Sequence, residues 1–295
     1  MSKVLNLLSP DYNYYPPQTK RLYPVICLVG VGGTGSNVAQ QLAQMLMMFG
    51  KKSYFCLADF DTIEKKNINN QLFVESNIGK KKAEILAGRY SQAYGIPVHS
   101  FTESYVEDVN TLRKLFSIDY DTYSGSVDVV LPILIGCVDN NYTRRVFHEL
   151  FETVPNLLYL DSGNESTTVP SDYPNRPKHQ WTADELKDYN FSGWTGQVCA
   201  GLKWNGKTIL EPVASRFPEI MLDDDEIKPS QLSCEELSAS DPQRLQTNKM
   251  AALALCSYLS ELFECGTISK SLTVFHAQKG YMKSEPINEN TPSIV

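Results

Sequence analysis

Apolar residues alternate between short strand-like runs and helical spacing through the first half of the chain. The predicted strands are residues 24–29, 53–59, 97–102, 127–137 and 157–161. The predicted helices between them are residues 34–49, 80–94, 108–117 and 140–152. Because each of these helices follows a strand, the pattern predicts a Rossmann-like, doubly wound and mainly parallel α/β sheet with helices on both faces.

The pattern changes in the second half of the chain. Residues 170–187 are rich in Pro, Asp and Lys, and two apolar runs around Asn205-Gly206 predict a pair of strands. Asp241-Pro242 predicts the start of a helix that continues to about Glu264. We therefore expect the parallel sheet to be extended by antiparallel strands and a C-terminal helix.

Composition limits the classes of function. The chain has 295 residues and a net charge of −7, which argues against a nucleic-acid partner. No apolar run is long enough to span a bilayer, and the N-terminus lacks the pattern of a signal peptide. We therefore expect a cytoplasmic protein with no membrane partner. The seven cysteines include no C-x-x-C pair, so we expect no zinc site.

The first predicted strand runs into a G-x-G-x-x-G motif, which indicates a nucleotide site. Its glycines are Gly30, Gly32, Gly33 and Gly35. They let backbone N–H groups and the positive end of the next helix approach phosphates. Asp59 ends the second strand, where an acidic side chain commonly binds ribose hydroxyls. These features also fit an NAD-dependent oxidoreductase, or a tight turn that binds no ligand.

The motifs that follow resemble one known superfamily. Asp59 and Asp61 form a D-x-D pair, residues 67–73 read N-x-x-x-Q-L-F, and residues 78–83 read I-G-x-x-K-A. Residues 137–144 read C-V-D-N-N-Y-T-R. This combination resembles the ThiF/MoeB/ubiquitin-activating superfamily, whose members adenylate the C-terminal carboxylate of ubiquitin-like proteins.

Further motifs are similar to the ThiF-type proteins of bacterial PRTRC systems, namely residues 161–164, 195–198 and 233–236. The resemblance implies a ThiF-like adenylation domain over residues 23–283. We divide this domain into a nucleotide-binding half, residues 23–165, and a partner-binding half, residues 166–283. We expect residues 1–22 to be an N-terminal extension and residues 284–295 to be a flexible tail.

The resemblance implies a site for ATP and Mg²⁺. It implies that Asp139 holds Mg²⁺ and that Lys82 neutralises the charge of the departing pyrophosphate. Read without the resemblance, Asp139 would cap the helix that begins at Asn140, and Lys82 would be a surface lysine. The full set implied at the nucleotide is Gly30, Gly32, Gly33, Gly35, Asp59, Asp61, Asn67, Asn70, Gln71, Lys82 and Asp139.

One position departs from the family pattern. Asn70 stands where the family has an arginine, so a neutral amide replaces a guanidinium that is expected to contact the phosphates. Either another cation substitutes for it or the activity is reduced. Arg144 matches the basic residue that follows the Mg²⁺ aspartate, although a helical arginine is usually an exposed salt-bridge former.

A cysteine could accept the activated carboxylate. Ser233 and Glu236 form a capping box, which would place Cys234 in the first turn of a helix, where the dipole lowers a thiol pKa. A cysteine that simply packs under the helix is the alternative. Cys199, among apolar neighbours on a predicted strand, is a weaker candidate.

These observations lead to one expected function and two alternatives. We expect an ATP- and Mg²⁺-dependent adenylyltransferase that activates the C-terminal tail of a small ubiquitin-like protein, with catalytic residues Lys82, Asp139 and Cys234. The resemblance also implies a homodimer. The alternatives are an ATP-binding scaffold for a ubiquitin-like protein, in which Asn70 marks lost adenylation, and the oxidoreductase.

Overall fold

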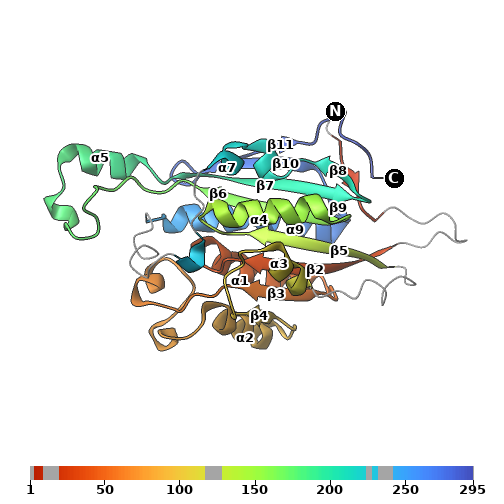
Figure 1. Ribbon diagram of the computed structural model, residues 1–295, viewed down its shortest axis with the longest axis horizontal. Helices are drawn as coiled ribbons and strands as arrows, with labels where there is room; N and C mark the ends of the chain where they lie inside the picture. The colour runs from red at the N-terminus through yellow and green to blue at the C-terminus, as the bar shows by residue number, and fades with distance from the viewer. Residues whose placement is uncertain (1–2, 9–19, 117–127, 224–227, 232–241, 295) are drawn as a thin grey trace, which may run out of the picture.

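The computed structural model describes residues 3–8, 20–116, 128–223, 228–231 and 242–294 (Figure 1). Within these residues, one sheet of nine strands crosses the molecule. Its parallel part has the spatial order β4-β3-β2-β5-β6. These strands are β2 (Arg21–Val29), β3 (Tyr54–Ala58), β4 (His99–Phe101), β5 (Asp128–Gly136) and β6 (Leu157–Asn164). The doubly wound, mainly parallel sheet predicted from the sequence is confirmed.

Antiparallel strands extend the sheet beyond β6. They are β7 (Thr195–Trp204), β8 (Lys207–Leu210), β10 (Lys270–His276) and β11 (Tyr281–Pro286). β7 pairs with β6, β10 with β7, β11 with β10, and β8 with β7. The turn between β7 and β8 has φ of 49° at Asn205 and 76° at Gly206, the positive values that an Asn-Gly hairpin turn needs. The hairpin expected at this dipeptide is confirmed.

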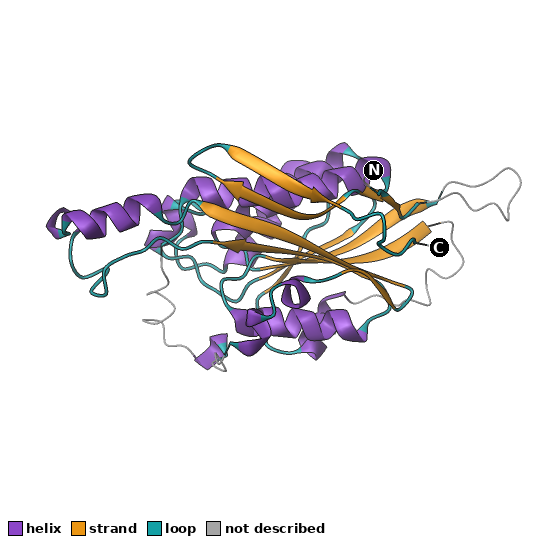
Figure 2. Ribbon diagram, turned by 90° about the horizontal axis from the view of Figure 1, so that it is seen from above, coloured by secondary structure: helices purple, strands orange, loops and turns teal. Residues whose placement is uncertain are grey.

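The alternation of side chains along β2 explains why helices cover both faces of the sheet. Leu22, Ile26 and Leu28 lie in one buried cluster, whereas Val25 and Cys27 lie in another. The first cluster also contains residues of α1 (Gly33–Met48), α2 (Lys82–Tyr94) and α9 (Leu245–Cys265). The second also contains residues of α3 (Val109–Phe116), α4 (Asn141–Thr153), α6 (Val213–Arg216) and α7 (Glu219–Leu222). Figure 2 shows the two helical layers with the sheet between them.

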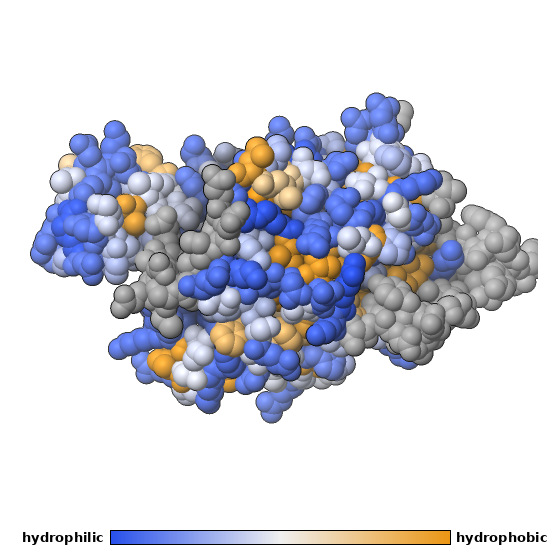
Figure 3. Space-filling view, in the orientation of Figure 1, coloured by the Kyte–Doolittle hydropathy of each residue, from blue (hydrophilic) through white to orange (hydrophobic). Residues whose placement is uncertain are grey.

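A segment between β6 and β7, residues 165–194, projects from the body at the left of Figure 1; we call it the arm. It contains the 3-10 helix η4 (Lys178–Gln180) and α5 (Ala183–Phe191). Its surface is mainly hydrophilic, as the left of Figure 3 shows. The remaining short elements are β1 (Leu5–Asn6), η1 (Lys65–Asn69), η2 (Glu75–Asn77), η5 (Pro229–Gln231) and β9 (Thr267–Ile268).

Two boundaries differ from the expectation. The flexible tail was expected from residue 284, but β11 continues to Pro286, and Ile287 is only 2% exposed because it packs into the core and pairs with Lys3. The C-terminal helix begins at Leu245, after Arg244, rather than at Asp241-Pro242, and Asp241 lies outside the described residues. Across the described ranges, no helix has the length and apolar character needed to cross a membrane.

Candidate nucleotide site

The glycine motif forms a tight loop between β2 and α1. Gly30 has φ of 83°, and a Cβ there would lie 2.6 Å from the carbonyl oxygen of Cys137. A Cβ on Gly35 would overlap the carbonyl oxygen of Gly30. The first and last glycines are therefore needed for the turn and for packing against the end of β5. The middle of the loop and the N-terminus of α1 form a region suited to an anion.

The sheet topology places the expected site residues at one edge. β2 and β5 are neighbours, and the helices that follow them, α1 and α4, cover opposite faces. Ligands of open α/β sheets bind at such a switch point, outside the carboxyl ends of the strands. Gly30 follows β2, Asp59 follows β3 and Asp139 comes shortly after β5. The three chain segments therefore meet where the resemblance implies a nucleotide.

Asp59 is fixed by the backbone around it. Its Oδ2 accepts a hydrogen bond from the N–H of Val31 at 2.7 Å, and its Oδ1 accepts one from the N–H of Asp61 at 2.9 Å. Burial raises the pKa of Asp59, and the nearby Asp61 raises it further, although Lys82 opposes both effects. Asp59 thus holds the glycine loop and the D-x-D segment in one arrangement.

Lys82 is a buried cation rather than the surface lysine of the alternative interpretation. Its side chain is 8% exposed, and its Nζ lies 2.8 Å from Oδ2 of Asp61. Burial by itself would lower the pKa of Lys82, but Asp59, Asp61 and Asp139 outweigh this effect and hold the pKa above its ordinary value. Lys82 therefore stays charged at the strand ends.

Tyr105 completes this group and was missed from the sequence. Its hydroxyl donates to Oδ1 of Asp61 at 2.9 Å, so the two oxygens of Asp61 bind Tyr105 and Lys82. Lys82 and Tyr105 hold the pKa of Asp61 below its ordinary value, although burial acts in the opposite direction. Tyr105 follows β4 in an irregular segment, where no motif or periodicity distinguishes it.

Asp139 lies beside the first turn of α4 and is exposed. The helix is capped by Asn140, whose Oδ1 accepts a hydrogen bond from the N–H of Thr143 at 2.8 Å. The interpretation of Asp139 as the helix cap is therefore wrong. Asp139 raises the pKa of both Lys82 and Arg144, so its carboxylate acts on the charged groups at both sides of the site.

Arg144 is buried, which corrects the view of it as an exposed salt-bridge former. Its Nε lies 3.1 Å from Oδ1 of Asp161, and one terminal nitrogen donates to the carbonyl oxygen of Val138 at 2.7 Å. Burial acts to lower the pKa of Arg144, but Asp161 and Tyr159 more than compensate. The hydroxyl of Tyr159 donates to the other oxygen of Asp161 at 2.8 Å. This cluster supports the strand end that precedes Asp139.

The polar positions at residues 67–71 differ in what their side chains contact. Asn67 is buried, and its Oδ1 accepts a hydrogen bond from the N–H of Glu64 at 2.7 Å, as a turn residue would. The side-chain nitrogen of Gln71 lies 3.7 Å from the position that a Cβ on Gly32 would take. Its Oε1 is buried without a hydrogen-bond partner among the described residues. Gln71 therefore brings an unsatisfied amide to the glycine loop.

Asn70 is bound to the C-terminal helix region. Its Nδ2 donates to the carbonyl oxygen of Gln243 at 3.0 Å, and its Oδ1 accepts from Nδ2 of Asn248 at 3.1 Å. Oδ1 of Asn248 in turn accepts from Thr34 at 3.2 Å and from Asn164 at 2.9 Å. This amide cluster, which the sequence patterns did not reveal, fastens α9 to the start of α1.

The structure tests only one of the two cysteines that could accept the activated carboxylate. Cys234 lies outside the described residues, so its role stays a prediction. Cys199 is 1% exposed, and burial raises its pKa to about 12. A thiol in that environment is neither accessible nor ionised, so Cys199 is wrong as a nucleophile.

The residues present fit a magnesium nucleotide. The glycine loop and the α1 N-terminus suit phosphates, and Lys82 supplies positive charge. Oε1 of Gln71, an acceptor with no partner among the described residues, suits a donor such as a ribose hydroxyl. Asp139 would hold Mg²⁺, which commonly takes one or two carboxylates together with phosphate oxygens. In the described part of the chain, no group of three or more His, Cys, Asp or Glu is placed to hold a metal.

Comparisons with known proteins show which proteins this chain resembles. The ThiF family model matches residues 17–151. Ubiquitin-like modifier-activating enzyme 5 of Oryza sativa subsp. japonica is 26% identical over 152 residues, which is 49% of this chain and 33% of that enzyme. The tRNA threonylcarbamoyladenosine dehydratase of Escherichia coli (strain K12) is 30% identical over 108 residues, which is 36% of this chain and 38% of that enzyme.

Solved structures support the fold. A crystal structure of E. coli MccB with ATP has a TM-score of 0.53 at 16% identity and covers 92% of this chain and 65% of that chain. In the sequence comparisons, the matched region spans about a third of the length of the ubiquitin-like modifier-activating enzymes 5. The ThiF/MoeB/ubiquitin-activating superfamily is supported, whereas the narrower PRTRC-type resemblance stays a prediction.

Proposed function

We propose that this chain is an ATP- and Mg²⁺-dependent adenylyltransferase that activates the C-terminal carboxylate of a ubiquitin-like protein. The observation that supports it most is the buried Lys82, which Asp61 holds beside Asp59 and Asp139 at the switch point of the sheet. A buried cation at a phosphate-binding loop is costly without a function, because burial disfavours its charge. The glycine loop alone would not separate this function from hydride transfer.

The residues of the site fit the chemistry of adenylation. An oxygen of the substrate carboxylate forms a bond to the α-phosphorus of ATP while the bond from that phosphorus to the pyrophosphate oxygen breaks. Both reactants are anions, so Lys82 would reduce their repulsion and stabilise the departing pyrophosphate. Mg²⁺, held by Asp139, would neutralise phosphate charge. The side-chain nitrogen of Gln71 and the loop N–H groups would donate to the phosphates and orient them.

A second function is favoured by one specific observation. Both ends of the Asn70 amide bind within the protein, to Gln243 and Asn248, so this position presents no cation to a nucleotide. A chain that binds ATP and a ubiquitin-like protein without joining them would need only the loop and the docking surface. The proposed homodimer and the cytoplasmic location accompany either function. A thioester on Cys234 accompanies only the adenylyltransferase, because the thiol needs an acyl-adenylate whose AMP can leave.

ATP–pyrophosphate exchange with candidate ubiquitin-like proteins from the same genome tests the proposal. Asp139→Ala is expected to abolish exchange while ATP still binds, because the loop and Lys82 remain. Glu149→Ala, which removes an exposed carboxylate near the C-terminal end of α4, is the matched control and is expected to leave exchange unchanged. ATP binding without exchange for any partner would contradict the adenylyltransferase and favour the scaffold.

A further inference from the structure

A cavity of about 230 Å³ lies on the α4 side of the sheet, apart from the glycine loop. Its polar side is formed by the first turn of α4 and by β6 and β7, which contribute Arg144, Asp161 and Gln197. Its apolar side is formed by the segment of α6 and α7, including Phe217 and Ile220. None of the residues placed at the nucleotide by the sequence lines it, so the cavity has no role in the function proposed so far.

The cavity opens beside the reaction centre rather than at a distance from it. Arg144, which lines it, donates to the carbonyl oxygen of Val138, the residue just before Asp139. Along the sheet, the order is β2, β5, β6 and β7, with neighbouring strands about 4.8 Å apart. The glycine loop therefore lies on one side of Asp139 and the cavity on the other. A nucleotide on the loop and a group in the cavity would approach Asp139 from opposite sides.

The polar groups of the cavity differ in how available they are. The guanidinium of Arg144 is committed to Asp161, Asn141 and the carbonyl oxygens of Val138 and Ser162. The buried Asp161 carboxylate neutralises the charge of Arg144, so the polar side of the cavity is held in place and nearly neutral. By contrast, the side chains of Gln197 and Glu219 make no hydrogen bond with any described residue. Within the described part of the chain, one amide and one carboxylate are therefore available to bind an occupant.

These features define the occupant by its chemistry. The cavity offers about 230 Å³, so a terminal glycine, which has no side chain, would leave it largely unfilled. The apolar wall suits an aliphatic stem, whereas Glu219 and Gln197 suit an end that donates hydrogen bonds. A carboxylate would face Glu219 without a free cation to oppose it among the described lining residues.

We infer that the cavity is a specificity pocket for a side chain in the C-terminal segment of the substrate, a medium-sized side chain with an apolar stem and a hydrogen-bond-donating end. This inference rests on the proposed function, since it concerns the same carboxylate substrate. It deepens that function by predicting that the activated tail carries a side chain, as in a Gln or Lys, close to its terminus and does not end in glycines alone.

Binding of short synthetic peptides to the full chain tests the inference independently of catalysis. The peptides differ only in their last residue, which is Gly, Leu, Gln, Lys or Glu. We expect the Gln and Lys peptides to bind about tenfold or more tightly than the Gly and Glu peptides. The same order is expected in kcat/KM for ATP–pyrophosphate exchange.

Gly163 offers a way to fill the cavity without disturbing the fold. It lines the cavity, and a Cβ there would contact only the side chain of Gln197, at 3.7 and 3.8 Å. Gly163→Val is expected to remove the preference for Gln and Lys peptides while ATP binding is unchanged. Gly88→Ala on α2, where a Cβ meets nothing within 4 Å, is the matched control and should retain the preference.

The outcomes separate this inference from the proposed function. Selective binding without exchange would support the pocket and contradict the adenylyltransferase. Exchange with equal binding of all peptides, tightest binding of the Gly peptide, or a preference that survives Gly163→Val would overturn the pocket and leave the function in place. Absence of binding by every peptide would overturn the pocket as well.

Discussion

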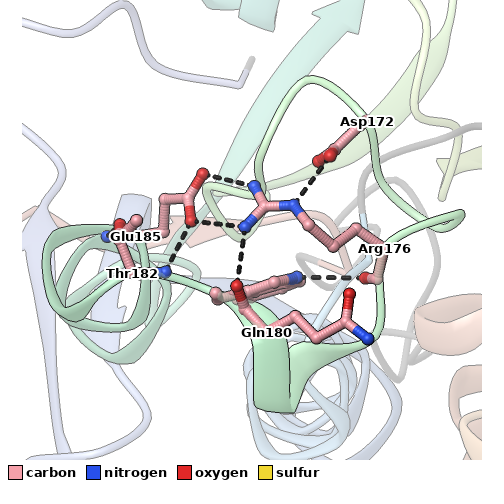
Figure 4. Close-up of polar contacts among 6 residues, drawn as sticks. Asp172, Arg176, Gln180, Thr182 and Glu185 are labelled. Atoms are coloured by element: carbon pink, nitrogen blue, oxygen red, sulfur yellow. Dashed lines mark hydrogen bonds and ion pairs between the residues drawn. The ribbon is translucent and has the colours of Figure 1, made fainter.

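Two arginine–carboxylate pairs lie in contrasting surroundings. Arg144 and Asp161 lie inside the protein next to the candidate site, and Arg176 and Glu185 lie in the arm. The Arg144 side chain is 12% exposed and its partner Asp161 is 2% exposed. Arg176 binds Glu185 and Asp172 at the surface of the arm, as Figure 4 shows. Each arginine also donates a hydrogen bond to a backbone carbonyl oxygen, Arg144 to that of Val138 and Arg176 to that of Gln180. The chemistry of the contacts is similar, and the difference is burial.

Burial determines what each pair can do. A buried pair stabilises the folded chain only while both partners remain, because a single buried charge is very unfavourable. A pair in contact with water is screened and shapes its own segment instead. We therefore expect the Arg144 pair to control the stability of the whole site, and the Arg176 pair to control only the order of the arm.

The largest effect is expected for Arg144→Leu. It leaves the Asp161 carboxylate buried without its cation and should lower the free energy of unfolding by about 3–5 kcal/mol. Urea denaturation measures the loss. Arg144→Leu combined with Asp161→Leu removes both charges and should recover most of it. If the single variant is as stable as the unchanged chain, the contrast between the two pairs is wrong.

Lys82→Met should have the next largest effect, on catalysis. Loss of its charge is expected to lower exchange by about 10²–10³-fold, whereas Lys82→Arg should lower it less. Because the pKa of Lys82 is raised on folding, its contribution to stability is full below the unfolded pKa near 10.5 and is lost as pH rises through the folded pKa. The stability difference between Lys82→Met and the unchanged chain should thus be constant near neutral pH. A difference that disappears well below pH 10 would contradict the geometry around Asp61.

The parallel part of the fold could be predicted from the sequence because its strands and helices are determined by residues close together in the chain. Each strand and helix is encoded within a few residues of its own position, and parallel strands bring their carboxyl ends to one edge. For this reason Gly30, Asp59, Lys82 and Asp139 were expected together, although no pattern measures the distances between them. Roles that came only from the resemblance, such as Mg²⁺ binding by Asp139, are still proposals.

The contacts that the sequence did not predict join residues far apart in the chain. Tyr105 reaches Asp61 across 44 positions, and Asn248 reaches Asn70 across 178. Whether such side chains meet depends on how helices pack and on which strand pairs with which. The burial of Arg144 is a similar case, because its sequence neighbours do not show that α6 and α7 cover its surroundings.

A smaller difference is expected between two glycines, one in the glycine loop and one outside it. Gly30 and Gly79 share φ of 83°, but a Cβ on Gly30 would meet the Cys137 carbonyl oxygen, whereas one on Gly79 would meet nothing within 4 Å. Gly79→Ala should cost about 1–2 kcal/mol of stability from the backbone alone. Gly30→Ala should cost about 1–3 kcal/mol more because of the overlap. Equal losses in thermal denaturation would show that the approach of β2 to β5 is not constrained by this contact.

The smallest effect on global stability is expected for Arg176→Gln. Hydrogen bonds from Arg176, and to a lesser extent from Thr182, lower the pKa of Glu185 to about 2 from 4.5. The Arg176–Glu185 pair joins the loop of the arm to the start of α5. Because the folded pKa is depressed, the stabilisation is complete above pH 4.5 and is lost as pH falls towards 2. Hydrogen exchange of α5 amides, corrected for intrinsic rates, should therefore accelerate in that range.

In Arg176→Gln the same amides should exchange faster already at neutral pH, while the urea midpoint of the whole chain stays unchanged. Lys187→Gln removes a positive charge from α5 without touching the pair, so it should leave their exchange unaltered. A fall in the urea midpoint as large as that of Arg144→Leu would mean that the arm is an integral part of the core. The contrast between a buried pair that stabilises the fold and a half-buried surface pair that orders one segment would then have to be abandoned.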